Sequence, residues 1–315
     1  MTDDIRATAL VSIGELARST GLAVRTIRFY CDEGILESRR SAGGHRMFEA
    51  DSAIERLLLI RRLRALGLGL GSIVEVLREQ RSIAEVVATE GARLDREFRS
   101  LAWRRAALRA VETAGPARRG QRLALLAAAA DGGAAHEHLV RFWRRVLAPI
   151  SGADFDIYVG WNIPEPSVVP SADEVVAYAG LAALTADPEM KSVVRQHLWR
   201  GQADLIRDHR GLYAAVEDVM VDVVARVAEG ARPRGGSELD RFVAAHAGAR
   251  GRRDSWDFRT RLLAGATDSD RRIRHYWALT AQLLGARITV GRALGWVDDA
   301  LTAAIGPGGV APEQR

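Results

Sequence analysis

The hydrophobic and polar positions at the start of the chain follow a helical period that glycine interrupts. Ser12 stands three residues before Glu15. At this spacing a hydroxyl and a carboxylate each satisfy a free backbone amide at a helix N-terminus. The apolar residues beside them repeat on one helical face, and they are Ile13, Leu16 and Ala17. We therefore predict a short helix that begins at Ser12 and ends in a turn at Gly21.

A second helical stretch begins near Val24. Its apolar positions Val24, Ile27 and Cys31 are three and four residues apart and are expected to face inward. The other side chains are expected to face outward, and they are Arg25, Thr26, Arg28, Phe29 and Tyr30. Two short helices joined by a glycine turn predict a helix-turn-helix whose second helix reads DNA. The alternative for this surface is a solvated basic face.

Residues 38–46 predict two short extended arms around Gly43 and Gly44, a pattern typical of a hairpin. The arms carry four basic side chains, namely Arg39, Arg40, His45 and Arg46. A glycine-tipped loop rich in arginine directly after a reading helix is typical of a wing that holds phosphates beside the major groove. The hairpin therefore favours nucleic-acid binding over the solvated face.

With these elements, residues 12–80 resemble the winged helix-turn-helix domain of the MerR family of transcription regulators. The resemblance rests on SIGELA at 12–17, VRTIRFY at 24–30, EGIL at 33–36, GHRMF at 44–48 and LLLIRRLRALG at 57–67. It covers about a quarter of the chain. The sequence departs from the family's pattern at Ala23 and Gly69, where two helices lack a good N-cap side chain.

The resemblance implies which side chains contact DNA. The first two helices and the wing would supply Arg18, Arg25, Thr26, Arg28, Tyr30, Arg40, His45 and Arg46. Arg62 and Arg64 on the next helix are expected as auxiliary phosphate contacts. Cys31 stands where the family often has Glu, and its inward position predicts a small buried side chain rather than a redox site.

The segment 83–111 predicts one long helix with an apolar seam. Gly91 and Arg105 interrupt a series of positions four and three residues apart, which are Val87, Leu94, Phe98, Leu101 and Leu108. This pattern favours an antiparallel dimerisation helix, and the alternative is an amphipathic helix packed on its own C-terminal domain. A dimer also suits DNA recognition, because two heads contact more of a palindrome than one head does.

After a helix-breaking stretch at 115–120, the pattern predicts further helices. They are expected at 136–150, from 171, from 187 and at 212–229, 237–247, 256–265 and 270–304. The fold class is therefore predicted as all-α in three parts. These are a winged helix-turn-helix at 1–80, a dimerisation helix at 81–114, and a helical effector-binding or regulatory domain at 115–315.

One stretch of this half, DFDIYVGWNIPEPSVVP at 154–170, contains aromatic residues and three prolines, and we expect it to be non-helical. A strand pattern competes only in 155–161. Aromatic side chains beside a few polar ones are typical of a small-molecule pocket, and the expected pocket residues are Trp143, Tyr158, Trp161 and Trp199. The alternative is a rigid connector whose aromatic side chains, like many tryptophans, belong to the core.

Composition narrows the possible functions. The net charge is +5, but residues 1–80 hold 12 Arg and 11 acidic residues, so a basic face on the head requires clustered arginines. A single cysteine excludes an internal disulfide and multi-thiol metal sites, and we expect no metal or cofactor. The acidic start and the short apolar run at 123–130 predict a soluble cytoplasmic protein without a membrane partner.

The sequence carries no glycine-rich phosphate loop and no nucleophile elbow, so we do not predict an enzyme. With the resemblance, it predicts a regulator that binds double-stranded promoter DNA at a palindromic operator as a homodimer. A small-molecule effector in the helical domain would switch it, and RNA polymerase would respond indirectly to the altered promoter. Two alternatives remain: a ligand-independent regulator that binds a protein partner, and an enzyme fused to a DNA-binding head.

Overall fold

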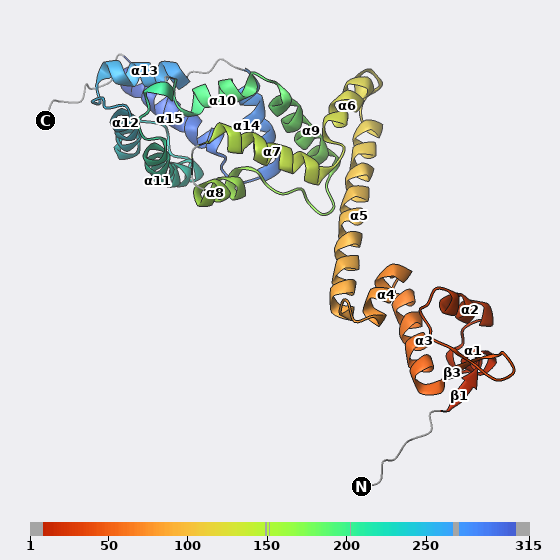
Figure 1. Ribbon diagram of the computed structural model, residues 1–315. Coiled ribbons are helices and arrows are strands. Elements are labelled where there is room, and N and C mark those ends of the chain that lie inside the picture. Colours follow the sequence, from red (N-terminus) through yellow and green to blue (C-terminus); the bar gives the residue numbers. More distant parts are fainter. Residues whose placement is uncertain (1–8, 149, 151, 202, 267–270, 307–315) are drawn as a thin grey trace, which may run out of the picture. The chain divides into compact units, whose positions relative to one another are not determined.

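The computed structural model describes residues 9–148, 150, 152–201, 203–266 and 271–306 of the chain. The chain forms two compact units, Met1–Glu97 and Phe98–Arg315. The division falls inside one continuous helix, α5 (Ile83–Glu112), which is labelled in Figure 1. The long helix expected at 83–111 is therefore confirmed, and its two halves belong to different units.

The first unit is a winged helix-turn-helix, as the sequence predicts. Before α5 it contains β1 (Leu10–Ser12), α1 (Ile13–Thr20), α2 (Val24–Asp32), β2 (Arg39–Arg40), β3 (Arg46–Glu49), α3 (Ala50–Ala65) and α4 (Leu70–Leu77). The strands form an antiparallel sheet in the order β1-β3-β2. Leu10 pairs with Glu49 and Arg39 with Met47, so the sheet joins the start of α1 to the wing.

The core of this unit holds the reading motif against α3. Leu16 on α1, Ile27 on α2 and Leu57 on α3 are fully buried in one cluster with Phe48 of β3. Burying a side chain of this kind contributes about 1.5–3 kcal/mol. Because the contacts come from every element of the motif, the core fixes the direction in which the outer face of α2 points.

All the regular secondary structure in the described residues of the second unit is helical. After the C-terminal half of α5 it contains the 3₁₀ helices η1 (Pro116–Arg118), η2 (Ala127–Ala129) and η3 (Ala203–Leu205). Its α-helices are α6 (Arg119–Leu126), α7 (Gly132–Val146), α8 (Gly152–Asn162), α9 (Ala172–Ala186), α10 (Met190–Leu198), α11 (His209–Ala228), α12 (Ser237–Ala249), α13 (Trp256–Ala266), α14 (Arg271–Leu284) and α15 (Val290–Ile305). The all-α class is confirmed.

Two large hydrophobic clusters organise these helices, and a smaller third cluster contains Trp199, Ile206 and Leu212. Trp103 of α5, Trp143 of α7 and Tyr178 of α9 lie in the first cluster, and Tyr276 of α14 joins them. The second cluster is formed by α11, α12, α13 and α15, with Phe242 of α12 fully buried in it. The C-terminal part of α10 contributes Leu198 to both clusters.

The expectation of a non-helical segment at 154–170 is wrong for its first part, because α8 is helical from Gly152 to Asn162. The buried residues of α8 are Phe155, Tyr158 and Asn162, which repeat at three and four positions. The prolines of the segment all follow the helix, so none of them interrupts it.

The single helix expected at 270–304 is also wrong. The structure contains two helices, α14 and α15, separated by a turn at Gly285. Gly285 has a φ of 63°, a left-handed conformation that glycine adopts readily. Thr289 then caps α15 by accepting a hydrogen bond from the Arg292 amide at 3.1 Å.

Candidate nucleic-acid interface

The first helix of the reading motif is fixed at both ends by local hydrogen bonds. The Glu15 amide donates to Ser12 Oγ at 3.3 Å, and the Ser12 amide donates to Glu15 Oε2 at 2.7 Å. These bonds from Ser12 also lower the pKa of the Glu15 carboxyl. At the other end Gly21, with φ 68°, donates its amide to Ala17 O at 3.0 Å. The predicted capping box and glycine turn are confirmed.

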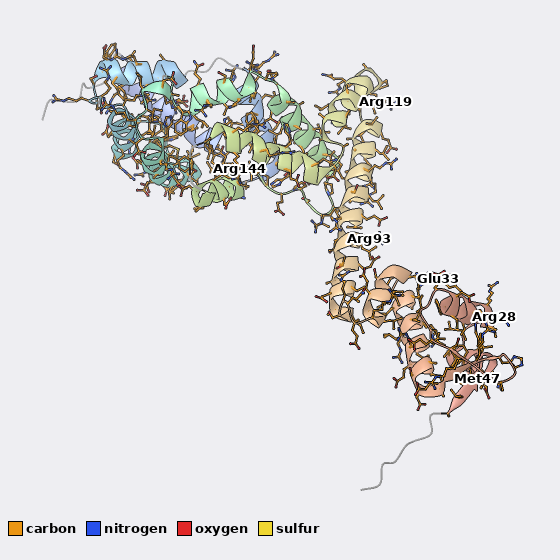
Figure 2. All side chains as sticks on the ribbon, viewed as in Figure 1. Arg28, Glu33, Met47, Arg93, Arg119 and Arg144 are labelled. Carbon is orange, nitrogen blue, oxygen red and sulfur yellow. The ribbon has the colours of Figure 1, made fainter. Side chains whose placement is uncertain are left out.

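The second helix presents the predicted basic face. Arg25 and Arg28 are exposed and Thr26 is half-buried, while Ile27 anchors the helix in the core. Figure 2 labels Arg28 on α2. Phe29 is 46% exposed beside these residues. The face therefore offers charged, hydroxyl and aromatic groups to a ligand outside the head.

Tyr30 lies on the opposite side of α2 from the position that the sequence predicts. It is 7% exposed and belongs to the core of the head, so its outward orientation is a wrong prediction. Its carbonyl accepts hydrogen bonds from the Ile35 and Leu36 amides at 2.9 and 3.1 Å. The reason is helical geometry, because Tyr30 follows the buried Ile27 by three residues and shares its face.

The wing is the predicted hairpin between β2 and β3. Its turn is closed by the Ser41 amide, which donates to His45 O at 2.9 Å, and by the Gly44 amide, which donates to Ser41 O at 2.9 Å. Gly44 has a φ of 78°, which favours glycine. Arg40 and His45 are exposed on the hairpin, together with Arg39.

Arg46 connects the wing to the reading helix. Its Nη2 lies 2.8 Å from Oδ1 of Asp32, the last residue of α2. This contact also raises the pKa of the Arg46 guanidinium. A phosphate that binds Arg46 must therefore share it with Asp32 or displace Asp32. Arg46 is among the DNA contacts that the resemblance predicts, but its bond to Asp32 could not be predicted from the sequence.

The remaining predicted contacts lie on α1 and α3. Arg18, Arg62 and Arg64 are exposed. Arg64 Nη1 donates to Leu68 O at 2.8 Å and so also stabilises the turn before α4. Arg61, which the sequence reasoning missed, donates to Thr20 O at 2.7 Å and links α3 to the end of α1.

Cys31 is half-buried at the end of α2, and burial raises the pKa of its thiol. A raised pKa disfavours the reactive thiolate. This placement agrees with the expectation that Cys31 packs as a small apolar side chain, and it does contact the core of the head.

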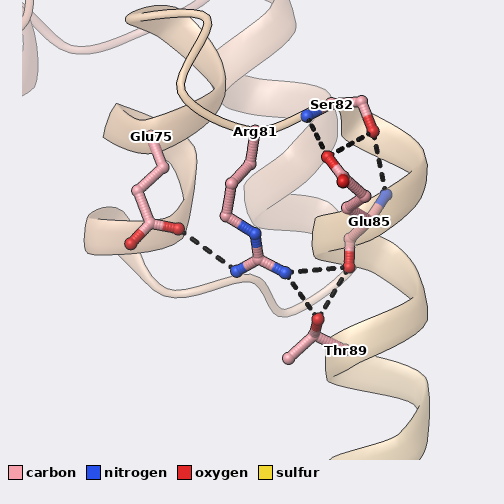
Figure 3. Close-up of polar contacts among 5 residues, drawn as sticks. All are labelled: Glu75, Arg81, Ser82, Glu85 and Thr89. Atoms are coloured by element: carbon pink, nitrogen blue, oxygen red, sulfur yellow. Dashed lines mark hydrogen bonds and ion pairs between the residues drawn. The ribbon is translucent and has the colours of Figure 1, made fainter.

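A polar junction connects α4 to α5 (Figure 3). Arg81 Nη1 lies 3.2 Å from Glu75 Oε2, and Arg81 Nη2 donates to Glu85 O at 3.1 Å and to Thr89 Oγ1 at 2.6 Å. The Ser82 amide donates to Glu85 Oε2 at 2.8 Å and caps α5. Arg81 thus joins the two helices, and sequence reasoning missed this structural contact because its partners come from both of them.

The predicted seam residues of α5 are exposed in the single chain. Their exposed fractions are 40% for Val87, 48% for Leu94, 53% for Phe98, 58% for Leu101 and 66% for Leu108. Large apolar side chains repeating along one helix favour contact with another apolar surface.

A charged face of α5 differs from the apolar seam. Arg93 pairs with Glu90 at 2.6 Å and with Glu97 at 3.1 Å within the same helix (Figure 2). Exposed pairs of this kind contribute little to the stability of a helix, because water and salt screen them.

The predicted pocket residues separate into two groups. Tyr158, Trp161 and Trp199 line one cavity of about 270 Å³ in the second unit. Trp143 lies outside that cavity, fully buried in the first hydrophobic cluster, where its Nε1 donates to Tyr276 Oη. Among the described residues, no group of three His, Cys, Asp or Glu side chains could hold a metal ion.

His136 and His138 on α7 each contact an oxygen through Nε2. These oxygens are the carbonyl of Ile163 at 3.2 Å and Oγ1 of Thr185 at 3.1 Å.

Within the ranges that the structure describes, no helix is long and apolar enough to cross a membrane.

Comparison with known proteins places the reading motif among DNA-binding regulators. Residues 11–80 match the family described as "MerR HTH family regulatory protein". The nodulation protein NolA of Bradyrhizobium elkanii is 38% identical over 84 residues, which cover 26% of this chain and 38% of NolA. The chain thus spans well under half of that relative's length.

Two further relatives carry regulatory names. The HTH-type transcriptional activator SoxR homolog of Chromobacterium violaceum is 34% identical over 91 residues, covering 29% of this chain and 61% of that protein. The HTH-type transcriptional regulator HmrR of Rhizobium leguminosarum bv. viciae is 28% identical over 98 residues, covering 29% of this chain and 75% of that protein. No solved structure matches the chain.

Proposed function

We propose, from the premise that residues 11–80 are a MerR-family DNA-binding head, that this transcription regulator binds a palindromic promoter operator as a homodimer. The observation that carries the proposal is the exposed face of α2 with Arg25 and Arg28, next to a wing with Arg40 and His45. In this assignment α2 contacts base edges in the major groove, and the wing holds phosphates at its flank.

The homodimer would form through α5. Its exposed apolar seam, centred on Phe98 and Leu101, supports contact with the same helix of a second copy. A dimer presents two reading helices, which accounts for an operator with two inverted half-sites. It also doubles the number of phosphates in contact, and this number determines how steeply the affinity falls with salt.

The regulatory step would act on the shape of the promoter. A dimer that bends or untwists the DNA between two promoter elements changes how RNA polymerase engages them, without contacting the polymerase itself. Bending the DNA of such an operator costs about 1–6 kcal/mol, which the contacts of the dimer must offset. An effector shifts the equilibrium only if it binds the two states with different affinity.

The second unit would bind that effector. The cavity lined by Tyr158, Trp161 and Trp199 supports a small molecule over the alternative of a protein partner, since a concave site with aromatic walls suits a small ligand. The effector signal would reach the head through α5, which belongs to both units.

Selection of binding sites tests the DNA-binding part. The purified full-length protein is incubated with random DNA at near-physiological salt, and the bound fragments are sequenced. Recovery of one inverted repeat that the Arg28→Ala variant no longer enriches is the expected result. Absence of any enriched sequence for the parent protein, or the same repeat for the variant, contradicts the assignment of α2 as the reading helix.

A further inference from the structure

The cavity of the second unit is partly open to solvent and lies between helices that are far apart in the sequence. Its walls come from α8, α10, α11, α12 and the start of α15. Five aromatic side chains line it, and they are Tyr158, Trp161, Trp199, Tyr213 and Phe242. Its volume of about 270 Å³ is close to the smaller end of known ligand pockets, which begin at roughly 300 Å³. The cavity therefore suits a compact molecule with flat, apolar faces.

Three residues of this lining carry buried polar atoms without a hydrogen-bond partner among the described residues. These atoms are the Tyr158 hydroxyl, Asn162 Oδ1 and Trp199 Nε1. The Nδ2 atom of Asn162 does have a partner, because it donates a hydrogen bond to Tyr158 O at 3.0 Å. Buried polar groups in proteins are normally paired, and an unpaired one destabilises the fold. Three residues that line the cavity thus each carry one unpaired polar atom, and these atoms are a donor, an acceptor and a hydroxyl.

The charge of the lining disfavours an anion. None of the described lining residues is Arg or Lys, and the carboxyl of Glu217 is the acidic group. Burial, together with the negative charges of Asp154 and Asp218, raises the pKa of Glu217, so a further negative charge on a ligand is unfavourable there. His246 also lines the cavity, and burial with the nearby Arg200 and Arg250 lowers its pKa well below the ordinary value, which keeps the imidazole neutral.

We propose that this cavity binds an uncharged, mainly apolar molecule of one or two rings that carries a hydroxyl or amide group. The rings would pack among Trp161, Tyr213 and Phe242. The polar group would supply hydrogen bonds to the unpaired atoms of Tyr158, Asn162 and Trp199. This assignment rests on the proposed function, in which the second unit senses a small molecule, and adds the chemical class of that molecule and the residues that recognise it.

A second cavity, of about 580 Å³, does not share this chemistry. Charged side chains line it, including Arg274, Arg287, Arg292, Asp298 and Asp299. An uncharged apolar ligand would remove the water around these groups without replacing its hydrogen bonds. The two cavities can therefore be distinguished by the charge of the ligand that each prefers.

Three compounds, naphthalene and two of its derivatives, test the assignment on the full-length protein without DNA. They are 2-naphthol, which is uncharged and carries a hydroxyl, naphthalene, which lacks it, and 2-naphthoate, which is anionic. Affinity is measured by quenching of tryptophan fluorescence and by calorimetry. We expect 2-naphthol to bind at one site, about three- to tenfold more tightly than naphthalene because of its hydrogen bonds. We expect 2-naphthoate to bind about tenfold more weakly than 2-naphthol or not at all.

Two tyrosine variants separate the cavity from the rest of the core. Tyr158→Phe removes an unpaired hydroxyl and is expected to reduce the preference for 2-naphthol over naphthalene by about threefold. Tyr178→Phe is the matched control, because its hydroxyl is bonded to Pro164 O and lies outside the cavity. An unchanged preference in Tyr158→Phe, or an equal loss in both variants, overturns the proposed contact.

A filling variant tests the location of the site. Val216 of α11 lines the cavity, and Val216→Trp is expected to abolish binding of both 2-naphthol and naphthalene while thermal unfolding remains cooperative. Retained binding in this folded variant, or tightest binding by 2-naphthoate in the parent protein, contradicts the proposal. If the variant does not fold, Tyr158→Phe still decides.

The failure of this proposal and the failure of the proposed function give different results. If no derivative binds while an inverted repeat is still enriched, the ligand class is wrong and the regulator stands. If 2-naphthol binds with the expected preferences while no DNA is enriched, the cavity assignment stands and the DNA-binding proposal is wrong.

Discussion

At the residue scale, the proposed function assigns two kinds of DNA contact to the head. Thr26 and Arg28 lie on α2, where side chains can reach base edges. Arg46 lies on the wing and is bonded to Asp32 at the end of the same helix. A base contact contributes to sequence preference, whereas a phosphate contact contributes to affinity for every sequence. The two kinds can therefore be told apart by mutation.

Replacement of single side chains tests this separation. Arg46→Ala is expected to weaken binding to all DNA sequences alike and to reduce the slope of log affinity against log salt by about 1. Arg28→Ala and Thr26→Ala are expected to alter sequence preference as well, with a loss of about 1–3 kcal/mol on the operator for a good base contact. Fluorescence anisotropy with operator and scrambled DNA measures both effects.

Arg253→Ala is a matched control for these variants. It removes one exposed arginine from the second unit, so the net charge falls by the same amount. We expect its affinity for DNA to equal that of the parent protein. Equal loss of affinity on every sequence from Thr26→Ala, Arg28→Ala and Arg46→Ala would contradict the placement of α2 in the groove.

His246 links the stability of the second unit to pH. It is 1% exposed, and Arg250 Nη1 lies 3.1 Å from its Nδ1. Its pKa is well below the ordinary 6.5, so the folded protein keeps it neutral while the unfolded chain takes up a proton below about pH 6.5. Above pH 6.5 we expect His246 to contribute its whole stabilisation. As the pH falls below 6.5, the free energy of unfolding is expected to decrease by up to about 1.4 kcal/mol per pH unit.

Denaturant unfolding between pH 8 and 5 measures this dependence. His138 and His209 also have lowered pKa values, mainly because of burial, and contribute in the same direction. His246→Gln is therefore expected to reduce the slope below pH 6.5 without abolishing it. His45→Gln, at an exposed position in the wing, is the matched control for the substitution itself. A parent protein equally stable at pH 8 and 5 would rule out the effect.

At the element scale, α5 carries the prediction about assembly. Its apolar seam is exposed and interrupted only at Gly91 and Arg105, and Leu101 is 58% exposed. Leu101→Glu places a charge in the seam and is expected to convert the dimer to a monomer at micromolar concentration, because burying an unpaired carboxylate is unfavourable. Sedimentation velocity measures the change in mass.

The control uses the same substitution away from the seam. Ala92 is exposed on α5 at a position next to Gly91, outside the apolar series. Ala92→Glu is expected to leave the dimer intact and DNA binding unchanged. If both glutamate variants sediment like the parent protein, α5 does not form the interface.

Elements differ in how far their own residues predict them. The bounds of α1 and α5 follow from caps and periodicity, which act within a few residues. The sequence pattern predicts a non-helical segment where α8 lies, because the prolines that follow the helix fall within the same aromatic stretch. The break between α14 and α15 was missed although Gly285 and Thr289 are ordinary stop and start signals.

At the scale of the whole molecule, the proposed switch requires that ligand and DNA influence each other. Thermodynamic linkage makes this coupling reciprocal, so any factor by which a ligand changes DNA affinity is the factor by which DNA changes ligand affinity. Coupling energies of about 1–3 kcal/mol are common, which correspond to about 5- to 150-fold.

The coupling can be measured with the naphthol probe and the selected operator. Saturating 2-naphthol is expected to change operator affinity by about fivefold or more. Saturating operator should change the affinity for 2-naphthol by the same factor. The Tyr178→Phe variant should show the parent's coupling. Binding of each ligand without any mutual effect would leave a DNA-binding protein with a ligand site but no switch.

The winged helix-turn-helix fold of the head and the helical class could be predicted from the sequence, because their signals are local. The Ser12–Glu15 capping box, the turn at Gly21 and the hairpin tip at Gly44 each depend on residues within four positions of one another. Short-range geometry of this kind is set by backbone conformation and is legible in the chain.

Contacts between side chains that are distant in the sequence became known only from the tertiary structure. The partner of Arg46 is 14 residues away, and the bond from Arg250 to Trp199 O spans 51 residues. The cavity joins residues from Leu147 to Leu294, and packing of the second unit placed Tyr158 there while leaving Trp143 in the core. Such contacts depend on how helices pack, and an apolar helical pattern shows that a face is buried without showing which face it meets.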